Sequence, residues 1–178
     1  MRTNNTSIKK GTINDIAELE SLYDALNDHL SANTNYPGWI KGIYPVRETA
    51  EKAIKEDSLY VLRKENSIAG SIILNHEPET AYDKVEWGID VTYDKIFVVR
   101  TLVVHPHFMK QGIAKRLMDF TKKLSISLGM KSIRLDVSVY NAPAIHLYEQ
   151  SGYTYVGTVD LGLPYDHLKW FKLYELIL

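Results

Sequence analysis

The alternation of apolar and polar positions divides the chain into short strands and amphipathic helices. A continuous apolar run over residues 96–104 predicts a buried strand, which ends at Pro106 because proline lacks the backbone N–H that a sheet needs. A helical repeat of apolar residues follows, with Gly129 where a helix C-cap is expected, and residues 133–137 form the next apolar strand. Such a strand–helix–strand unit predicts two parallel strands joined by a right-handed crossover. The repeat consists of Ile113, Leu117, Phe120, Leu124 and Leu128.

The residues before this unit predict a strand, two helices and a hairpin. Thr12 can cap the first helix, with Asp15 three residues later in a capping-box position. The polar residues 64–67 separate two apolar runs and predict the hairpin turn, and residues 79–94 are expected to form a long polar connection. The expected elements are a strand at residues 7–10, helices at residues 13–31 and 47–56, and strands at residues 59–63 and 68–74.

The end of the chain predicts one more helix and two strands. Asn141 can cap the helix, Pro143 is tolerated in its first turn, and Gly152 can take the left-handed position after it. Residues 153–159 and 170–177 are expected to form two antiparallel strands. Together the elements predict an α/β or α+β layer fold, with a mixed, mostly antiparallel sheet of about seven strands, a central parallel pair and helices on both faces. The 178 residues are expected to form a single domain.

The composition narrows the classes of partner. A net charge of −1 does not suggest nucleic acid or an anionic membrane as the main partner. The absence of cysteine excludes disulfides, thiolate metal sites and a cysteine nucleophile, and it fits a reducing cytosol. No apolar run approaches the roughly 18 residues that span a bilayer, and residues 1–6 are polar and lack the apolar core of a signal peptide. We therefore expect a cytoplasmic protein without a bound metal.

The turn into the long helix has the features of an anion-binding site. Gly112 and Ala114 keep side chains away from the helix start, while Lys110, Lys115 and Arg116 add positive charge. A helix N-terminus also presents unpaired N–H groups and a partial positive charge, which suit a phosphate or pyrophosphate. The alternative is an ordinary strand–loop–helix whose small residues allow close packing. A dinucleotide-binding turn is less favoured, because neither G-x-G-x-x-G nor G-x-x-x-x-G-K-[ST] occurs here.

Two motifs carry a family resemblance. The first, Leu102-Val103-Val104-His105-Pro106 followed by Gln111-Gly112-Ile113-Ala114, resembles the acetyl-CoA-binding motif of the GCN5-related N-acetyltransferases. The second is similar in spacing to that family's N-x-x-A-x-x-x-Y-x-x-x-G-Y signature, and it consists of Asn141, Ala144, Tyr148, Gly152 and Tyr153. The family's loop usually runs R/Q-G-x-G-x-G/A. Met109 and Lys110 depart from that pattern, although backbone N–H groups can still bind phosphate there.

The resemblance implies that acetyl-CoA is the cofactor, with its pyrophosphate on the N-terminus of the long helix. It also implies that the pantetheine arm enters where the strands ending at Val104 and Val137 splay apart. A backbone N–H near the end of the first strand would stabilise the oxyanion as an amine attacks. The implied cofactor residues are Leu102, Val103, Val104, Met109, Lys110, Gln111, Gly112, Ile113, Ala114, Lys115, Asn141 and Tyr148.

By the same resemblance, Tyr148 falls on the position of the family's general acid, where a hydroxyl can protonate the leaving thiolate. The alternatives are a core tyrosine on an amphipathic helix and, for Asn141, a helix cap without a cofactor contact. An amine must also lose a proton before it attacks. The family often uses a carboxylate or histidine for this step, so Glu86, His76 and Glu77 are the candidate bases, each with a solvated or structural role as its alternative.

Residues 31–45 form an unusually aromatic segment without a helical or strand period. Large apolar rings in a loop need something to cover. The resemblance places the acceptor site beside the early helices, with Trp87 covering it from the long connection. The alternative is a minicore of rings packed under the loop. The candidate acceptor residues are His29, Tyr36, Trp39, Tyr44 and Glu77.

These observations predict an N-acetyltransferase that moves an acetyl group from acetyl-CoA to a primary amine of a small molecule or peptide. Two alternatives stay open. One is a non-catalytic coenzyme A-binding or regulatory module in which Tyr148 is structural, and the other is a nucleotide-binding protein that uses the helix start alone. The two motifs favour the first function over the third. The small net charge gives no preference among amines, and a homodimer is compatible with this fold.

Overall fold

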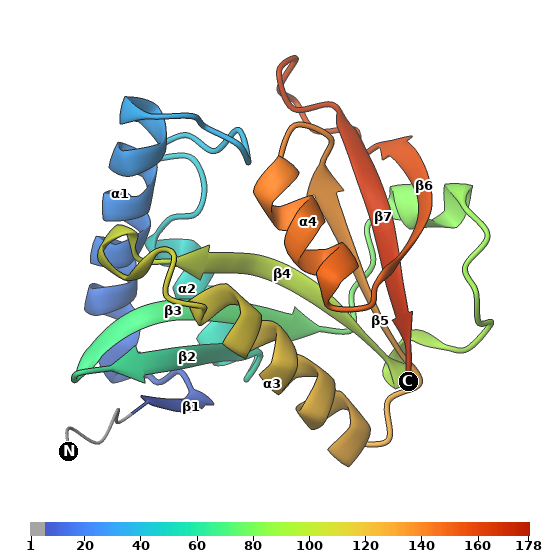
Figure 1. The fold of residues 1–178 in the computed structure, drawn as a ribbon, viewed down its shortest axis with the longest axis horizontal. Coiled ribbons are helices and arrows are strands. Elements are labelled where there is room, and N and C mark those ends of the chain that lie inside the picture. Colours follow the sequence, from blue (N-terminus) through green and yellow to red (C-terminus); the bar gives the residue numbers. More distant parts are fainter. Residues whose placement is uncertain (1–5) are drawn as a thin grey trace. The chain divides into compact units, whose positions relative to one another are not determined.

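The computed structural model describes residues 6–178, and its elements follow the predicted order (Figure 1). The expectation about the signal peptide falls largely on residues 1–5, which lie outside the described residues. The strands are β1 Thr6–Lys10, β2 Leu59–Lys64, β3 Ser67–Asn75, β4 Ile96–Val104, β5 Ser132–Ser138, β6 Thr154–Asp160 and β7 Trp170–Ile177. The α-helices are α1 Ile16–Ala32, α2 Arg47–Lys55, α3 Ile113–Ser127 and α4 Ala142–Gln150. Short 3₁₀ helices are η1 Ile13–Asp15, η2 Thr80–Lys84, η3 Tyr93–Lys95 and η4 Pro106–Phe108.

The strands form one mixed sheet in the order β1-β2-β3-β4-β5-β7-β6. β4 and β5 are parallel, with residues 96–99 opposite residues 132–135, while β1–β2, β2–β3, β5–β7 and β6–β7 are antiparallel. The predicted fold class is therefore confirmed, including the parallel pair β4 and β5, which precede and follow α3 in the sequence. Within residues 6–178 no helix is long and apolar enough to cross a membrane.

The chain packs into two compact units. The N-terminal unit contains residues 6–35, 39–74 and 100–120, and the C-terminal unit contains residues 36–38, 75–99 and 121–178. That all 178 residues act as a single domain stays a prediction.

The core of the N-terminal unit forms because α1 and α2 each carry one apolar face. The α1 residues recur at helical spacing, as the sequence predicted, and they pack on β2, β3 and the end of β4. Leu19, Leu22 and Tyr23 are among the largest fully buried side chains. The partly buried Trp39 and Met109 pack against this core from two loops. The remaining buried members are Leu26, Leu30, Ala50, Ala53, Leu59, Val61, Ile68, Ile73 and Val103.

The core of the C-terminal unit corrects one prediction, because the connection before β4 is not simply polar. Its residues Ala81 and Tyr82 are buried, and they pack with Val98, Val159 and Leu173 of the sheet. The 3₁₀ helices η2 and η3 bend the chain so that apolar side chains without a regular period still face the sheet. Trp87 joins this cluster, where it lies over Arg134 and donates its indole N–H to the Tyr82 carbonyl at 3.0 Å.

A buried ion pair ties this connection to the sheet. Arg134 on β5 donates from Nε to Glu175 Oε1 on β7 at 3.0 Å, and both side chains are almost fully buried. The backbone N–H of Gly88 donates to Glu175 Oε2 at 2.6 Å, and Arg134 Nη2 donates to the Ile89 carbonyl at 2.8 Å. The guanidinium carbon lies 4.3 Å from the ring centroid of Trp87. Buried charges need such complete pairing, so the connection and the two strands stabilise one another.

Other boundaries agree with the sequence or shift for identifiable reasons. The hairpin turn is narrower than predicted, because only Glu65 and Asn66 lie between the strands, both with positive φ. The first helix begins with a 3₁₀ turn before α1, and Thr12 and Asp15 form the expected capping box. Leu128 is 53% exposed and does not extend the apolar stripe of α3, since that helix ends at Ser127.

Candidate functional site

The turn into α3 is where the sequence predicts an anion-binding helix start. Gly112 has φ +75°, and the first backbone bond of the helix runs from the Arg116 N–H to the Gly112 carbonyl at 3.0 Å. The N–H groups of Ile113, Ala114 and Lys115 therefore precede the first bond of the helical ladder. This part of the predicted cofactor site contains free backbone donors and the positive end of the helix dipole.

Lys110 adopts a conformation that favours glycine. Its φ is +60°, at the position where the family's pattern usually has its first glycine. A side chain in this left-handed region costs about 1–2 kcal/mol relative to glycine. Lys110 therefore has the left-handed backbone conformation that glycine adopts most easily, and this conformation is strained for a lysine. Met109, the other departure, packs against the apolar core of the N-terminal unit and anchors the loop.

Two polar side chains of the predicted cofactor set already have protein partners. Gln111 donates from Nε2 to the His107 carbonyl at 3.2 Å and accepts from Lys64 Nζ at 2.5 Å. Lys115 forms an exposed ion pair with Asp119 at 2.7 Å. These contacts fix the loop around the helix start, so the backbone is better placed than these side chains to bind a ligand.

The end of β4 contains a second backbone irregularity. Thr101 has φ +43°, which is a rare conformation for a β-branched residue. Its side chain is buried, and its hydroxyl is hydrogen-bonded to the phenol of Tyr44. After it, Leu102 and Val104 are half-buried, whereas Val103 belongs to the core of the N-terminal unit. The predicted role of these backbone groups in cofactor binding stays a prediction.

The structure brings together two of the predicted acceptor residues. The rings of Trp39 and Tyr44 meet edge to face, with centroids 5.5 Å apart, and the Tyr44 carbonyl accepts from Asn27 Nδ2 at 3.2 Å. This arrangement has features of the predicted minicore, because Trp39 also packs on the apolar core. His29 is half-buried on α1, and Tyr36 is exposed in the C-terminal unit. The acceptor role of all four residues stays a prediction.

Asn141 precedes α4 in the C-terminal unit as its N-cap residue, and Tyr148 lies in the last turn of that helix. Asn141 Oδ1 accepts from the Ala144 N–H at 3.3 Å, which confirms the predicted helix cap. Tyr148 is 6% exposed, and its ring lies near those of Tyr153 and Tyr174. Burial, with a smaller contribution from the Asp136 carboxylate, raises the pKa of Tyr148 well above its ordinary value. The phenol therefore stays protonated at neutral pH, as a general acid must be.

Asp136 is a candidate site residue that the sequence analysis did not select. It lies on β5, is only half-buried, and accepts a hydrogen bond from the Tyr82 hydroxyl at 2.6 Å. Its negative charge acts on Tyr148, so a carboxylate and a protonated phenol are electrostatic neighbours in this unit. The signal that could have identified it is a carboxylate between the apolar residues Leu135 and Val137 of a strand, shortly before the second motif.

The three predicted bases are less well suited to the role. His76, Glu77 and Glu86 are all exposed. The His76 ring stacks on Phe97, and its Nδ1 lies 2.7 Å from the Ile96 carbonyl and 3.0 Å from the Tyr93 carbonyl. A nitrogen that faces two acceptors must carry the ring proton. The His76 ring therefore donates to the backbone at the start of β4, which is a structural role.

Comparison with known proteins adds three findings. The model of the acetyltransferase (GNAT) family matches residues 19–153. A streptothricin acetyltransferase from Escherichia coli is 32% identical over 73 residues, which are 41% of this chain and 41% of that protein. The match to this curated relative therefore spans less than half of its length.

Solved structures share the fold along almost the whole chain. A GNAT family acetyltransferase from Streptococcus agalactiae aligns with a TM-score of 0.76 and 18% identity, covering 99% of this chain and 98% of that one. A Salmonella typhimurium protein solved with its cofactor acetyl-CoA aligns with a TM-score of 0.70 and 14% identity, covering 98% and 94%. At these identities the alignments show the fold alone.

Proposed function

Because the chain belongs to the acetyltransferase (GNAT) family, we propose that it transfers an acetyl group from acetyl-CoA to a primary amine of a small molecule or peptide. The family predicted from the two motifs is confirmed, and acetyl-CoA is the cofactor of that family. The observation that best supports catalysis is in the C-terminal unit, where the Asp136 carboxylate accepts from the Tyr82 hydroxyl at 2.6 Å and Tyr148 presents a buried phenol whose pKa is raised by burial and by Asp136. The streptothricin acetyltransferase relative favours acetyl transfer, and the amine acceptor is our proposal.

The helix start of the N-terminal unit would hold the anionic part of the cofactor. The N–H groups of Ile113, Ala114 and Lys115 precede the first helical bond, and the left-handed conformations at Lys110 and Gly112 turn the chain ahead of them. Backbone donors at a helix start suit a pyrophosphate because they combine hydrogen bonds with the helix dipole. Acetyl-CoA supplies the acetyl thioester when it is bound.

We propose that Asp136 acts as the base and Tyr148 as the acid. Asp136 would accept the proton of the acceptor ammonium, directly or through water, so that the amine nitrogen can attack the acetyl carbon. The C–N bond would form as the C–S bond breaks, and the attacking nitrogen would lose its second proton to solvent water, so that a neutral amide results. Tyr148 is protonated because burial and the Asp136 charge raise its pKa, and it would donate a hydrogen bond and then a proton to the sulfur. The predicted bases His76, Glu77 and Glu86 remain candidates with weaker structural support.

The acceptor would meet a partly apolar surface. Trp39 and Tyr44 form an edge-to-face pair in the loop after α1, and the Tyr44 hydroxyl is held by Thr101. Aromatic rings bind both alkyl chains and ammonium groups, and so favour an amine with a hydrophobic part. His29, Tyr36 and Glu77 stay in the proposed acceptor set from the sequence alone.

The test is calorimetric titration with acetyl-CoA, followed by thiol release over a panel of small amines and peptide N-termini. We expect binding, and release for one class of amine. A Tyr148→Phe variant serves as the control, because it keeps the ring but loses the proton donor. Binding with no release for any amine would favour the non-catalytic coenzyme A module. No binding would reject the proposal and leave only the shared fold.

We also propose a cytoplasmic location and, as an assembly, a homodimer. The cysteine-free sequence supports the location. Cell fractionation with a tagged full-length chain checks the location, and sedimentation of the purified protein over a range of concentrations checks the assembly.

A further inference from the structure

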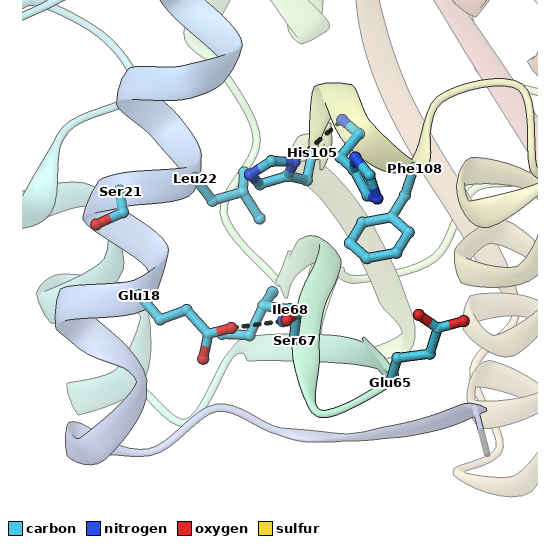
Figure 2. A pocket seen from close by; sticks show the side chains of 9 residues that line it. Glu18, Ser21, Leu22, Glu65, Ser67, Ile68, His105 and Phe108 are labelled. Atoms are coloured by element: carbon cyan, nitrogen blue, oxygen red, sulfur yellow. Dashed lines mark hydrogen bonds between the residues drawn. The ribbon is translucent and has the colours of Figure 1, made fainter.

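A pocket of about 370 Å³ opens in the N-terminal unit, and none of the residues predicted for the cofactor or the acceptor lines it (Figure 2). Its wall comes from the first turns of α1, the β2–β3 turn with the start of β3, and the segment that follows β4. All three segments belong to one unit, so the pocket is a feature of that unit itself. The polar side chains that line it are Glu18, Ser21, Glu65, Ser67, His105 and His107.

The charge of the wall is negative. Its ionised side chains are the carboxylates Glu18 and Glu65, with no lysine or arginine among the lining residues. Arg63, outside the wall, pairs with Glu18 at 3.0 Å and with Asp15 at 2.5 Å. One guanidinium thus balances two carboxylates, which leaves a net negative charge beside the pocket. Lys64 Nζ lies 5.9 Å from the centroid of the Phe108 ring and donates to the neutral amide of Gln111, so its positive charge offsets the negative charge of Glu65.

Glu18 is fixed in place rather than free to turn into solvent. Its Oε1 accepts from the backbone N–H of Ile68 at 2.6 Å, and Arg63 holds its Oε2. Each carboxylate oxygen retains a further lone pair for a ligand. A preorganised carboxylate loses less conformational entropy on binding than a mobile one.

His105 adds a neutral polar group to the wall. Its Nδ1 accepts from the His107 N–H at 3.1 Å, so the proton of the neutral ring lies on Nε2. Burial, together with the neighbouring His107, lowers the pKa of His105 and outweighs the opposite effect of Glu18. A neutral imidazole does not repel a cation at neutral pH.

An apolar surface completes the pocket. Leu22, Ile68 and Phe108 are almost fully buried and present carbon to the pocket. Figure 2 shows Glu18 and Glu65 on opposite sides of the first residues of β3, with Phe108 above Glu65. A carboxylate on each side of the start of β3, together with the apolar surface of Phe108, Leu22 and Ile68, matches an alkyl chain that carries an ammonium group at each end.

We propose that this pocket binds a small organic cation of the alkyl diamine class. Glu18 and Glu65 hold the ammonium groups, and the methylene chain lies along Phe108 and its apolar neighbours. The site is separate from the proposed chemistry, and its occupant contacts the segment that leads directly into the helix start. Ligand binding here is independent of whether the chain transfers acetyl groups.

The test is calorimetric titration of the full chain with 1,4-diaminobutane, without acetyl-CoA, with 1,4-butanediol as the neutral probe. We expect the diamine to bind and the diol not to bind. The double variant Glu18→Gln/Glu65→Gln should weaken diamine binding about tenfold, because it removes both charges and keeps their shapes. Since Glu18 also supports β3, a second variant, Ser21→Phe, fills the pocket with both charges intact and should weaken binding as strongly.

The matched control is Asp24→Asn, which removes an exposed carboxylate from the same helix outside the pocket and should leave binding unchanged. Thermal melting of every variant checks that the chain is folded. The proposal fails if the wild-type chain does not bind the diamine, or if the pocket variants bind it as tightly as Asp24→Asn. It also fails if Trp39→Ala abolishes binding while the pocket variants retain it, since the diamine would then occupy the acceptor surface.

Discussion

The two units carry different kinds of functional group. In the N-terminal unit the candidate cofactor site is made of backbone, with unpaired N–H groups at the start of α3 and left-handed residues at Lys110 and Gly112. In the C-terminal unit the candidate chemistry is made of side chains, the carboxylate of Asp136 and the protonated phenol of Tyr148. Substitutions in the first unit should therefore change cofactor affinity, and those in the second should change turnover.

The units also differ in how charge stabilises them. The C-terminal unit contains the buried pair Arg134–Glu175, whereas the N-terminal pairs, such as Lys41–Asp28, are exposed or only partly buried. Removing one partner of a buried pair leaves an uncompensated charge, while exposed pairs contribute little. Stability should respond strongly to charge removal at Arg134–Glu175 and hardly at all at an exposed pair such as Lys41–Asp28.

The largest expected effect follows from this contrast. Arg134→Met should lower the free energy of unfolding by about 3–5 kcal/mol, because Glu175 is left buried without its partner. Lys41→Met removes an exposed pair and should cost less than about 1 kcal/mol. Urea unfolding of both variants measures the difference. Equal losses would show that the buried pair does not organise its unit, and the double variant Arg134→Met/Glu175→Leu should recover much of the loss.

The next effect concerns the carboxylate that the sequence did not reveal. Asp136→Asn should lower kcat about a hundredfold with the Kd of acetyl-CoA unchanged, since the amide keeps its hydrogen bond from Tyr82 and cannot accept the ammonium proton. Steady-state kinetics with a reactive amine, together with calorimetry, checks both quantities. If the triple variant of His76, Glu77 and Glu86 loses turnover while Asp136→Asn retains it, the base lies in the exposed set instead.

Tyr148 should produce a smaller loss with a recognisable pH dependence. Tyr148→Phe should lower kcat about thirtyfold, below the usual range for a lost acid because a thiolate is already a good leaving group. Burial raises the pKa of the phenol above 10.0, so the wild-type acid stays protonated as pH rises to that value. The kcat profile should therefore show no alkaline loss from Tyr148 up to pH 10.0. A loss between pH 8 and 10 that disappears in Tyr148→Phe contradicts this assignment.

The cofactor site should respond to backbone changes. Gly112 and Gly129 stand at the two ends of α3, with φ of +75° and +72°, and each has open space where a Cβ would lie. Alanine at either position costs about 1–2 kcal/mol in strain. Only Gly112→Ala should also weaken acetyl-CoA binding, by about tenfold. Equal Kd values for the two variants in calorimetry would show that the start of α3 does not bind acetyl-CoA.

The sequence predicted the parts of this protein that depend on local patterns. Three such features are confirmed: the apolar strand before Pro106, the helix caps at Asn141 and Gly129, and the parallel pairing of β4 with β5. These features follow from hydrophobic period, from cap chemistry and from the crossover rule, each of which acts over a few residues or one unit.

The sequence missed what depends on distant partners. Tyr82 and Asp136 are 54 residues apart, and no local pattern indicates that one donates a hydrogen bond to the other. The connection containing Trp87 also lacks a helical or strand period of apolar residues. Its 3₁₀ turns direct the apolar side chains toward the sheet, and the Trp87 ring packs against the Arg134 guanidinium. The exposed bases were chosen for residue type alone, and only burial and contacts distinguish such residues from Asp136.

The smallest expected effect is at Lys110, where strain and charge act in opposite directions. Lys110→Gly should raise the free energy of unfolding by about 0.5–1 kcal/mol, because glycine adopts φ +60° without strain and part of the gain is lost to a more flexible unfolded chain. The same change removes a positive charge next to the helix start, so acetyl-CoA binding should weaken about twofold at low salt and not at high salt. Lys110→Gln is the matched control, since it loses the charge and keeps the strain. Calorimetry should give the two variants the same Kd, and urea unfolding should stabilise only the glycine variant. If both variants are equally stable, the left-handed backbone at this position carries no strain, and the usual glycine of the family must be explained by contact with the cofactor instead.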